Sequence, residues 1–282
     1  MNNFFKDITF IIVSFQSEKV IDTCIDSLNS VSKILVIENS NNHLIKQNLE
    51  KKYSNLQVKI VGKNLGYSKA NNLGLEMVKT KYAFILNPDA SLAKNALKEI
   101  EFAISFLKND FTLLGPKFFE MNGSSSLGSD KDNIVDKVDY IKGFAIFVNM
   151  KKINFKPIFD ENFFLFLEEI DLCKRINDSD GKIYIVNKSY VYHKGKKSSG
   201  NDLEIEKCRN WHWMWSLFFY NKKHYGNFTA YRVTLHKFFS SLLKFLIGFI
   251  FFKNKSYLIY KSRMEGLINA YFNKSSWKRP YE

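Results

Sequence analysis

The fold is decided by the stretch Ile8-Thr-Phe-Ile-Ile-Val13, a short run of apolar and β-branched side chains. A run with so few polar interruptions is typical of a strand that is buried on both faces. Further strands and amphipathic helices alternate along the chain, the strands at residues 34–37, 57–61 and 82–86 and the helices at residues 20–28, 67–78 and 91–107. This alternation predicts βαβ units, and therefore an α/β fold with a mainly parallel, Rossmann-like sheet and helices on both faces.

The composition is that of a globular protein. Of 282 residues, 45% are hydrophobic and 25% are charged, values that exclude wholesale disorder. Three scattered cysteines, Cys24, Cys173 and Cys208, fit neither a disulfide framework nor a zinc knuckle. The first residues lack the basic start and long apolar run of a signal peptide. We therefore expect a cytoplasmic protein with reduced thiols.

The positive charge is concentrated at one end of the chain. Residues 206–282 hold 14 Lys and Arg against Glu206, Glu265 and Glu282, so that +11 of the net +14 lies there. Residues 1–205 are nearly neutral. The pattern predicts a body of residues 1–205 followed by a basic, aromatic-rich helical extension of residues 206–282 with a role of its own.

Ligands of a parallel sheet bind beyond the carboxyl ends of its strands. The residues that follow the predicted strands are therefore the first candidates for a site: 14–15, 38–39, 62–66 and 87–89. No Gly-x-Gly-x-x-Gly or P-loop motif follows a strand, which disfavours dinucleotide dehydrogenases and P-loop NTPases. A zinc enzyme is disfavoured too, since the chain has no His-Glu-x-x-His or Cys/His cluster.

Two acids at strand ends each allow two interpretations. Glu38 could accept a hydrogen bond from a nucleobase N–H or a ribose hydroxyl, or it could simply begin an Asx-rich turn. Asp89 follows Pro88, which ends the strand and places the carboxylate beyond the sheet. Such a carboxylate suits a divalent cation that bridges a diphosphate, or alternatively caps the next helix.

Carboxylates and phenylalanines are interleaved in residues 159–175. A helix that starts near Glu168 would place Glu168, Glu169 and Asp171 in its first turn, with Asp171 four residues before Arg175. Glu169 would be partly desolvated by the neighbouring rings, which raises a carboxyl pKa toward that of a general base. His193 follows a predicted strand and could meet a phosphate or a metal, although a lone histidine is more often structural.

Seven motifs occur in a fixed order along the chain. They are Ile-Ile-Val-Ser-Phe-Gln-Ser at 11–17, Ile-Glu-Asn-Ser at 37–40, Asn-Leu-Gly-Tyr-Ser-Lys-Ala-Asn-Asn-Leu-Gly at 64–74, Leu-Asn-Pro-Asp-Ala at 86–90, Ile-Lys-Gly-Phe-Ala at 141–145, the acidic and aromatic segment at 159–175, and Val-Tyr-His at 191–193. Over roughly residues 8–226 the chain resembles bacterial family 2 glycosyltransferases of the rhamnosyltransferase-like branch.

The resemblance implies a glycosyltransferase A-type fold, a nucleotide-diphospho-sugar donor, Mg²⁺ or Mn²⁺, and inversion at the anomeric carbon. Glu169 is the implied catalytic base, Glu168 its substitute, and Asp89 the metal ligand. The implied donor-binding residues are Ser14, Phe15, Glu38, Asn64, Gly66, Asn87, Gly143 and His193. The chain departs from the family pattern at Glu38 and Glu169, where Asp is usual, and at Asn87, which replaces the first acid of the wider metal motif.

The extension contains two helical stretches. Residues 203–225 predict a helix that ends before Gly226, and residues 238–252 are apolar apart from two serines and Lys244. As a helix the second stretch would measure about 22 Å, short of the ~30 Å hydrocarbon core of a bilayer. Its flanking lysines and aromatics suit the anionic surface of a membrane, and packing on the domain or in a homodimer is the alternative. Nucleic acid is not expected, because an apolar run does not fit a phosphate-tracking surface.

These observations lead to one expected function and two alternatives. We expect sugar transfer from a donor such as dTDP-rhamnose to a saccharide or polyprenyl-diphosphate-linked acceptor, at the inner face of the cytoplasmic membrane, in cell-surface polysaccharide synthesis. The first alternative is a catalytically weak nucleotide-sugar-binding protein that tethers partner enzymes. The second, a sugar-1-phosphate nucleotidyltransferase, would require a Gly-rich basic loop where this chain has Ser14-Phe-Gln-Ser17.

Overall fold

The computed structural model describes residues 3–28, 32–120, 133–193, 202–251 and 255–281. The chain divides into two compact units. The sheet unit comprises Met1–Leu65, Lys69–Asp160 and Glu169–Ser199, and the helical unit comprises Gly66–Ser68, Glu161–Glu168 and Gly200–Glu282.

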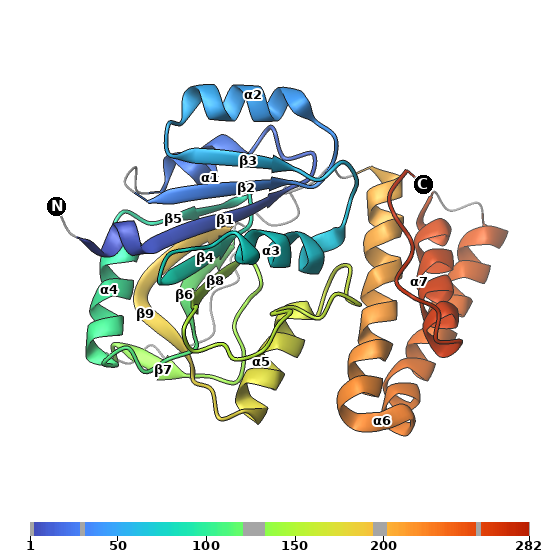
Figure 1. The fold of residues 1–282 in the computed structure, drawn as a ribbon. Coiled ribbons are helices and arrows are strands. Elements are labelled where there is room, and N and C mark those ends of the chain that lie inside the picture. Colours follow the sequence, from blue (N-terminus) through green and yellow to red (C-terminus); the bar gives the residue numbers. More distant parts are fainter. Residues whose placement is uncertain (1–2, 29–31, 121–132, 194–201, 252–254, 282) are drawn as a thin grey trace. The chain divides into compact units, whose positions relative to one another are not determined.

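The described part of the sheet unit contains a nine-stranded sheet with the order β3-β2-β1-β4-β8-β6-β9-β5, and β7 pairs with β9 (Figure 1). The strands are β1 (Ile8–Ser14), β2 (Lys33–Glu38), β3 (Leu56–Ile60), β4 (Tyr82–Leu86), β5 (Ala90–Leu92), β6 (Leu113–Glu120), β7 (Val135–Lys137), β8 (Ala145–Asn149) and β9 (Ile183–His193).

The α/β fold class is confirmed, and the sheet is mixed. β3, β2, β1 and β4 run parallel, as βαβ connections require. Beyond β4 the direction alternates, because β8 is antiparallel to both β4 and β6 and β9 is antiparallel to β5 and β7. Among the described strands, β6 and β9 form one further parallel pair. The parallel half is the part that the alternation of strands and helices predicts.

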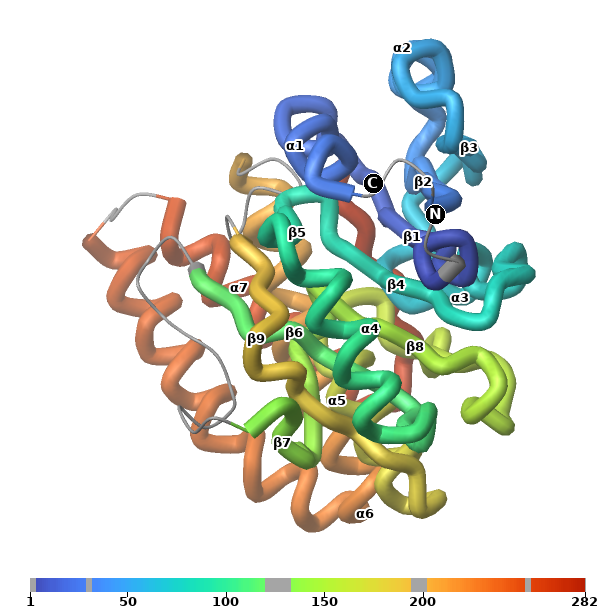
Figure 2. Tube along the Cα trace, turned by 90° about the vertical axis from the view of Figure 1, so that its left-hand side faces the viewer, coloured from blue at the N-terminus to red at the C-terminus, as the bar shows by residue number. Residues whose placement is uncertain are grey.

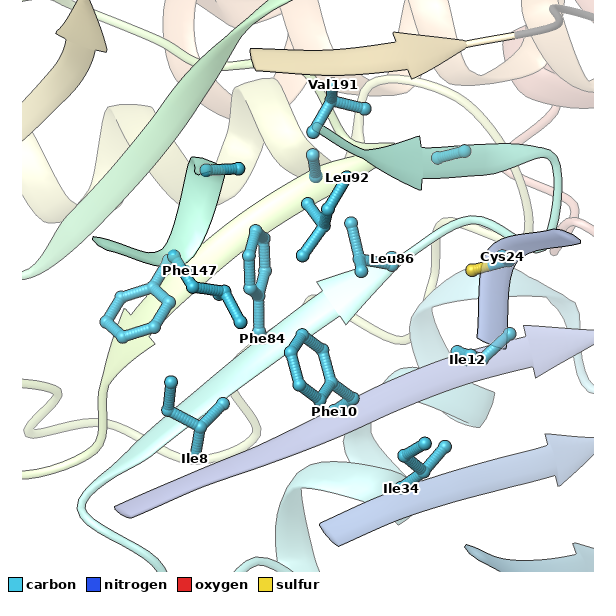
Figure 3. Packing of buried hydrophobic residues seen from close by; sticks show 14 of the residues in the cluster. Ile8, Phe10, Ile12, Cys24, Ile34, Phe84, Leu86, Leu92, Phe147 and Val191 are labelled. Carbon is cyan, nitrogen blue, oxygen red and sulfur yellow. The ribbon is translucent and has the colours of Figure 1, made fainter. Parts of the chain in front are cut away.

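Helices lie on both faces of the sheet. They are the 3₁₀ helix η1 (Asn3–Asp7), and α1 (Ile21–Asp26), α2 (His43–Lys52), α3 (Gly66–Glu76), α4 (Ala96–Phe106) and α5 (Glu168–Asp178). Alternate residues of β1, namely Ile8, Phe10 and Ile12, lie in one buried cluster with Cys24 of α1 (Figure 3). Apolar residues of α2 and α4 belong to the same cluster. Ile11 points to the opposite face, where Gly74 of α3 lies against it.

The expected helix at 91–107 begins later than its sequence indicates. Ser91 lies in β5, which pairs antiparallel with β9, and α4 starts only at Ala96. The expectation that Ser91 opens the helix is therefore wrong. Its cause is a strand pairing with a distant part of the chain, which outweighs the local capping preference of serine.

The helical unit contains α6 (Leu203–Ile250) and α7 (Ser256–Tyr271), which pack against each other (Figure 2). Gly226 interrupts α6 with φ 82° and ψ 170°, a conformation that glycine adopts without a steric penalty. Small residues, namely Ala230, Thr234, Ser241 and Gly248, form the buried side of α6 after this kink. The two helices approach closely there, since a Cβ on Gly248 would lie 2.9 Å from the Cβ of Tyr257.

His212 on α6 is buried in the helical unit. Its Nε2 lies 2.7 Å from the carbonyl oxygen of Lys278, so Nε2–H donates this hydrogen bond. Burial lowers the pKa of His212 to about 3, and the neighbouring charges of Arg279 and Lys278 add to the effect. The imidazole is therefore neutral at physiological pH.

We expect this histidine to make stability fall as the solution is acidified. The unfolded chain binds a proton on His212 below about pH 6.5, and the folded chain binds it only near pH 3. The free energy of unfolding should therefore decrease by about 2 kcal/mol between pH 7 and pH 5 through this residue alone. Urea denaturation of His212→Gln should show a correspondingly weaker pH dependence.

The matched control is His236→Gln, which changes an exposed histidine of the same helix. It should keep the pH dependence of the parent protein. Equal pH dependence in the parent and in His212→Gln would contradict a neutral buried imidazole.

Candidate functional site

The ends of several strands meet at one edge of the sheet. The parallel strands β1, β2 and β4 end there with Ser14, Glu38 and Leu86. Because β8 runs antiparallel to β4, with Ala145 opposite Leu86, its amino end reaches the same edge. The N–H of Asn87 accordingly donates to the carbonyl of Phe144, at 2.9 Å. Residues far apart in the sequence are thus presented at one edge.

Glu38 is a buried carboxyl at this edge. Only 1% of the residue is exposed, and it lies opposite Ser14 in the register of β1 and β2. Burial raises the pKa of Glu38, and the hydrogen bond that the hydroxyl of Ser40 donates to Oε1 offsets the increase in part. A carboxyl held in this way can accept a hydrogen bond from a ligand N–H or hydroxyl.

An amide pair fixes the loop after β3. Asn39 donates through Nδ2 to Oδ1 of Asn64 at 3.0 Å, and its own Oδ1 accepts from the N–H of Leu65 at 2.8 Å. Asn64 is thereby tied to the end of β2. On the β1 side, Phe15 is half-buried, and its N–H donates to the hydroxyl of Ser17 at 3.2 Å.

Asp89 and His193 form a pair at the same edge. Nε2 of His193 lies 3.4 Å from Oδ1 of Asp89, and the two side chains are 12% and 1% exposed. They meet because Ala90 is opposite His193 in the β5–β9 pairing. The imidazole also stacks on the ring of Phe144, with centroids 4.2 Å apart, which sets its orientation.

The pair fits a divalent cation that takes most of its ligands from elsewhere. In the described part of the chain, no group of three or more His, Cys, Asp and Glu could hold a metal. An ion such as Mg²⁺ keeps several waters and binds through one or two protein groups plus substrate phosphates. Asp89, together with His193, would supply that number of protein ligands.

Glu169 lies in the first turn of α5 and alongside Gly143. A Cβ on Gly143 would lie 3.5 Å from the Cβ, Cγ and Cδ of Glu169, so the carboxylate stem follows the glycine backbone. Burial raises the pKa of Glu169. The charge of Lys142 and the N–H groups of Glu169 and Ile170 counteract this in part. A carboxyl with a raised pKa is suited to accept a proton near neutral pH.

The other acids of this segment are placed differently. Glu168 is buried, begins α5 and is grouped with the helical unit. Asp171 forms the expected i, i+4 pair, in which Nε of Arg175 lies 2.8 Å from Oδ2. Its structural role is therefore confirmed.

Gly66 opens α3 in a conformation that favours glycine, with φ +81°. A Cβ at this position would overlap the ring and carbonyl of Phe164 in the same unit. The N–H of Tyr67 donates to that carbonyl at 2.7 Å. The loop after Asn64 is thus held against the segment that precedes Glu168.

Two contributors to the site, Phe144 and Lys142, were not among the predicted residues. They flank Gly143 in the motif at 141–145. Their roles depend on His193 and Glu169, which lie far along the chain.

Comparison with known proteins identifies the family of this chain. The family described as Glycosyl transferase family 2 matches residues 9–157, which carry Ser14, Glu38, Asp89 and Gly143. The chain belongs to this family. The expected enzyme class is thereby confirmed at the level of the family.

Individual relatives of this family 2 protein are distant. It is 23% identical over 206 residues to the low-salt glycan biosynthesis hexosyltransferase Agl10 of Haloferax volcanii, covering 64% of this chain and 66% of the relative. The S. aureus TarS 1–349 structure with UDP-GlcNAc has a TM-score of 0.56 at 14% identity and covers 95% of this chain and 92% of that one. GalNAc-T7 with UDP, GalNAc and Mn²⁺ has a TM-score of 0.55 at 13% identity, over 66% and 43% of the two chains. These structures show the shared fold.

Two glycines of the family 2 domain allow a controlled test of the Gly66 packing. Gly62 and Gly66 have nearly the same φ, +79° and +81°, but the space for a Cβ is open at Gly62. Gly62→Ala should therefore cost backbone strain alone, roughly 1–2 kcal/mol. Gly66→Ala should cost more and also loosen the loop, because Phe164 must move. Thermal denaturation of both variants measures the difference, and equal losses would contradict the close packing.

Proposed function

We propose that this family 2 protein is an inverting, metal-dependent glycosyltransferase that uses a nucleotide-diphospho-sugar. The observation that carries the proposal is the arrangement at one sheet edge of the buried Asp89–His193 pair and the buried carboxyl of Glu38. Glu169 adds a proton acceptor beside Gly143 in the same unit. These groups supply what a displacement at an anomeric carbon requires.

The donor would bind along the sheet edge. Glu38, flanked by Ser14 and Phe15, would hold the N–H edge of a uracil or thymine, and Asn64 would shape the pocket from the next loop. Asp89 and His193 would hold the divalent ion and, through it, the diphosphate. When bound, the ion supplies positive charge that offsets the charge developing on the leaving nucleoside diphosphate.

Glu169 would act as the base. Its carboxylate takes the proton of an acceptor hydroxyl while that oxygen bonds to the anomeric carbon and the bond from this carbon to the diphosphate oxygen breaks. The products are the glycosylated acceptor, the nucleoside diphosphate and a protonated Glu169. Attack opposite the leaving group inverts the anomeric configuration.

The finer assignment concerns the donor and the acceptor. The motif resemblance supports a rhamnosyltransferase-like enzyme with dTDP-rhamnose as donor. A saccharide or polyprenyl-diphosphate-linked acceptor is supported by the basic and apolar extension. TarS was solved with UDP-GlcNAc and GalNAc-T7 with UDP and Mn²⁺, which supports a pyrimidine nucleotide and a divalent ion for this chain.

The extension would hold the enzyme on the anionic inner face of the cytoplasmic membrane. α6 is long and apolar enough to cross a bilayer by length and composition, and only 17% of its apolar window is buried. The exposed apolar residues after Gly226 recur at helical spacing, namely Phe228, Leu235, Phe239, Leu243, Leu246 and Ile250. They lie opposite the small residues that contact α7. This part of α6 also carries the charged residues Arg232, Lys237 and Lys244. A helix of this kind is better suited to lie in the membrane interface than to cross the bilayer.

A pair of substitutions tests the reaction. Asp89→Asn should abolish the Mn²⁺-dependent rise in melting temperature that a dTDP-, UDP- or GDP-sugar produces, because it removes the buried anionic ligand. Glu169→Gln should bind the donor as the parent does but lower transfer at least a hundredfold, because the amide cannot accept the proton.

Thermal shift and transfer assays with membrane lipid extract measure the two effects separately. The matched control for Glu169→Gln is Asp178→Asn, which changes an exposed acid of the same helix. Asp171→Asn would not serve as a control, because it breaks the ion pair of a buried carboxylate. Undiminished turnover by Glu169→Gln would exclude it as the base. Donor binding without turnover by the parent protein would favour the alternative of a nucleotide-sugar-binding tether.

A second test addresses the membrane. Phe239→Asp should reduce flotation with anionic vesicles severalfold, because a charge would enter the apolar face of α6. Phe102→Asp is the matched control: Phe102 is 56% exposed on α4, compared with 61% for Phe239. Equal flotation of both variants would remove this face from the membrane contact.

A further inference from the structure

The segment that leads into Glu168 and Glu169 has an unfavourable backbone. Phe166 and Leu167 have φ values of 71° and 66°, so two consecutive non-glycine residues are left-handed. Each such residue costs roughly 1–2 kcal/mol, and the conformation persists only where the surroundings impose it. The contacts of residues 161–168 therefore determine how α5 begins.

Residues 161–168 are held in the helical unit by contacts from α6 and from the region after α7. From α6, the hydroxyl of Ser216 donates to the carbonyl of Leu165 at 2.9 Å, and Phe219 packs edge-to-face on Phe163. From the region after α7, the hydroxyl of Ser276 donates to the carbonyl of Asn162 at 2.6 Å. The segment is thus anchored both by α6 and by the region after α7.

Phe164 is the centre of these contacts. The imidazole of His212 stacks on its ring with centroids 4.4 Å apart, and the guanidinium of Arg279 lies 3.9 Å from the ring centroid. Both groups also donate to the carbonyl of Lys278, at 2.7 and 2.9 Å. Phe164 is therefore held by one group from α6 and one from the region after α7, and a cation over an aromatic face is favourable.

Residues 274–279 are themselves tied to α6. The indole N–H of Trp215 donates to the carbonyl of Lys274 at 2.9 Å, and His212 donates to that of Lys278 at 2.7 Å. Arg279 donates through Nη1 to the carbonyl of Ser276 at 2.8 Å. The backbone of this stretch is thus fixed, and it presents the guanidinium to Phe164.

We propose that residues 274–279 form a positioning segment for the catalytic base, in which Arg279 clamps Phe164 and so imposes the left-handed turn from which Glu168 and Glu169 start α5. The inference rests on the proposed function for Glu169, and Arg279 acts through Phe164 without touching substrate. Release of the clamp lets Phe166 and Leu167 relax to favourable backbone angles. The first turn of α5 then loses its fixed direction.

The test compares Arg279→Ala, Arg279→Lys and Lys274→Ala. Lys274 belongs to the same segment and its side chain is exposed, while its backbone N–H donates to the carbonyl of Asn269 and its carbonyl accepts from Trp215. Its replacement by alanine therefore removes an equal charge without opening the clamp. Arg279→Ala should lower kcat for transfer at least tenfold and leave the donor-induced thermal shift within twofold in apparent affinity. The kcat of Arg279→Lys should lie between those of the parent protein and Arg279→Ala. Added guanidinium should restore part of the activity of Arg279→Ala.

The pH profile provides a readout that simple destabilisation does not move. The carboxyl of Glu169 is faced by Lys142 and the first N–H groups of α5, with Cys173 one turn away. Loosening the turn would hydrate this carboxyl, so the acidic limb of the kcat profile should shift to lower pH in Arg279→Ala. The proposal would be overturned if Arg279→Ala kept the kcat and the acidic limb of the parent protein. It would also be overturned if Lys274→Ala lowered kcat as much as Arg279→Ala does.

Hydrogen exchange separates the two proposals if the parent protein transfers no sugar. Amides of residues 161–168 should exchange at least tenfold faster in Arg279→Ala than in Lys274→Ala. Faster exchange without any transfer by the parent would reject the proposed function and keep the clamp. Unchanged exchange would reject the clamp whatever the activity.

Discussion

The site depends on the direction of β8. This strand lies between β4 and β6 and runs antiparallel to both, with Ala145 opposite Leu86. Its amino end therefore brings Gly143 and Phe144 to the edge where the parallel strands β1, β2 and β4 end. Phe144 orients His193 by stacking, and Gly143 leaves room for the stem of Glu169. A parallel β8 would place both residues at the opposite edge of the sheet.

The sequence predicted the half of the fold in which local patterns are sufficient. Buried strands alternating with amphipathic helices identified β1 to β4, and the acidic first turn identified the start of α5 and the Asp171–Arg175 pair. It did not predict the reversal of direction after β4, because an apolar strand such as β8 has the same pattern in either direction. Ser91 was misassigned for a similar reason, since β5 exists only through its pairing with β9.

The candidate site likewise has parts that local sequence predicts and parts that depend on contacts between distant residues. Strand-end positions such as Glu38 and Asp89 were predictable, because the rule that ligands bind beyond carboxyl ends needs only local information. The pairing of Asp89 with His193 was not, since the register of β5 and β9 creates it. The contact between Arg279 and Phe164 could not be predicted either, because nothing in the sequence associates Arg279 with the segment before Glu168.

The two departures from the family pattern have different physical settings. Glu38 lies opposite Ser14, and the hydroxyl of Ser40 donates to its Oε1, so the longer side chain keeps one oxygen hydrogen-bonded. Glu169 has its stem against Gly143, where a Cβ would be in ordinary contact at 3.5 Å and a larger side chain would displace the carboxyl. The longer acid and the glycine are therefore compatible as a pair. A carboxylate lengthened by one methylene keeps a defined position only if its stem is packed, and the glycine backbone provides that packing.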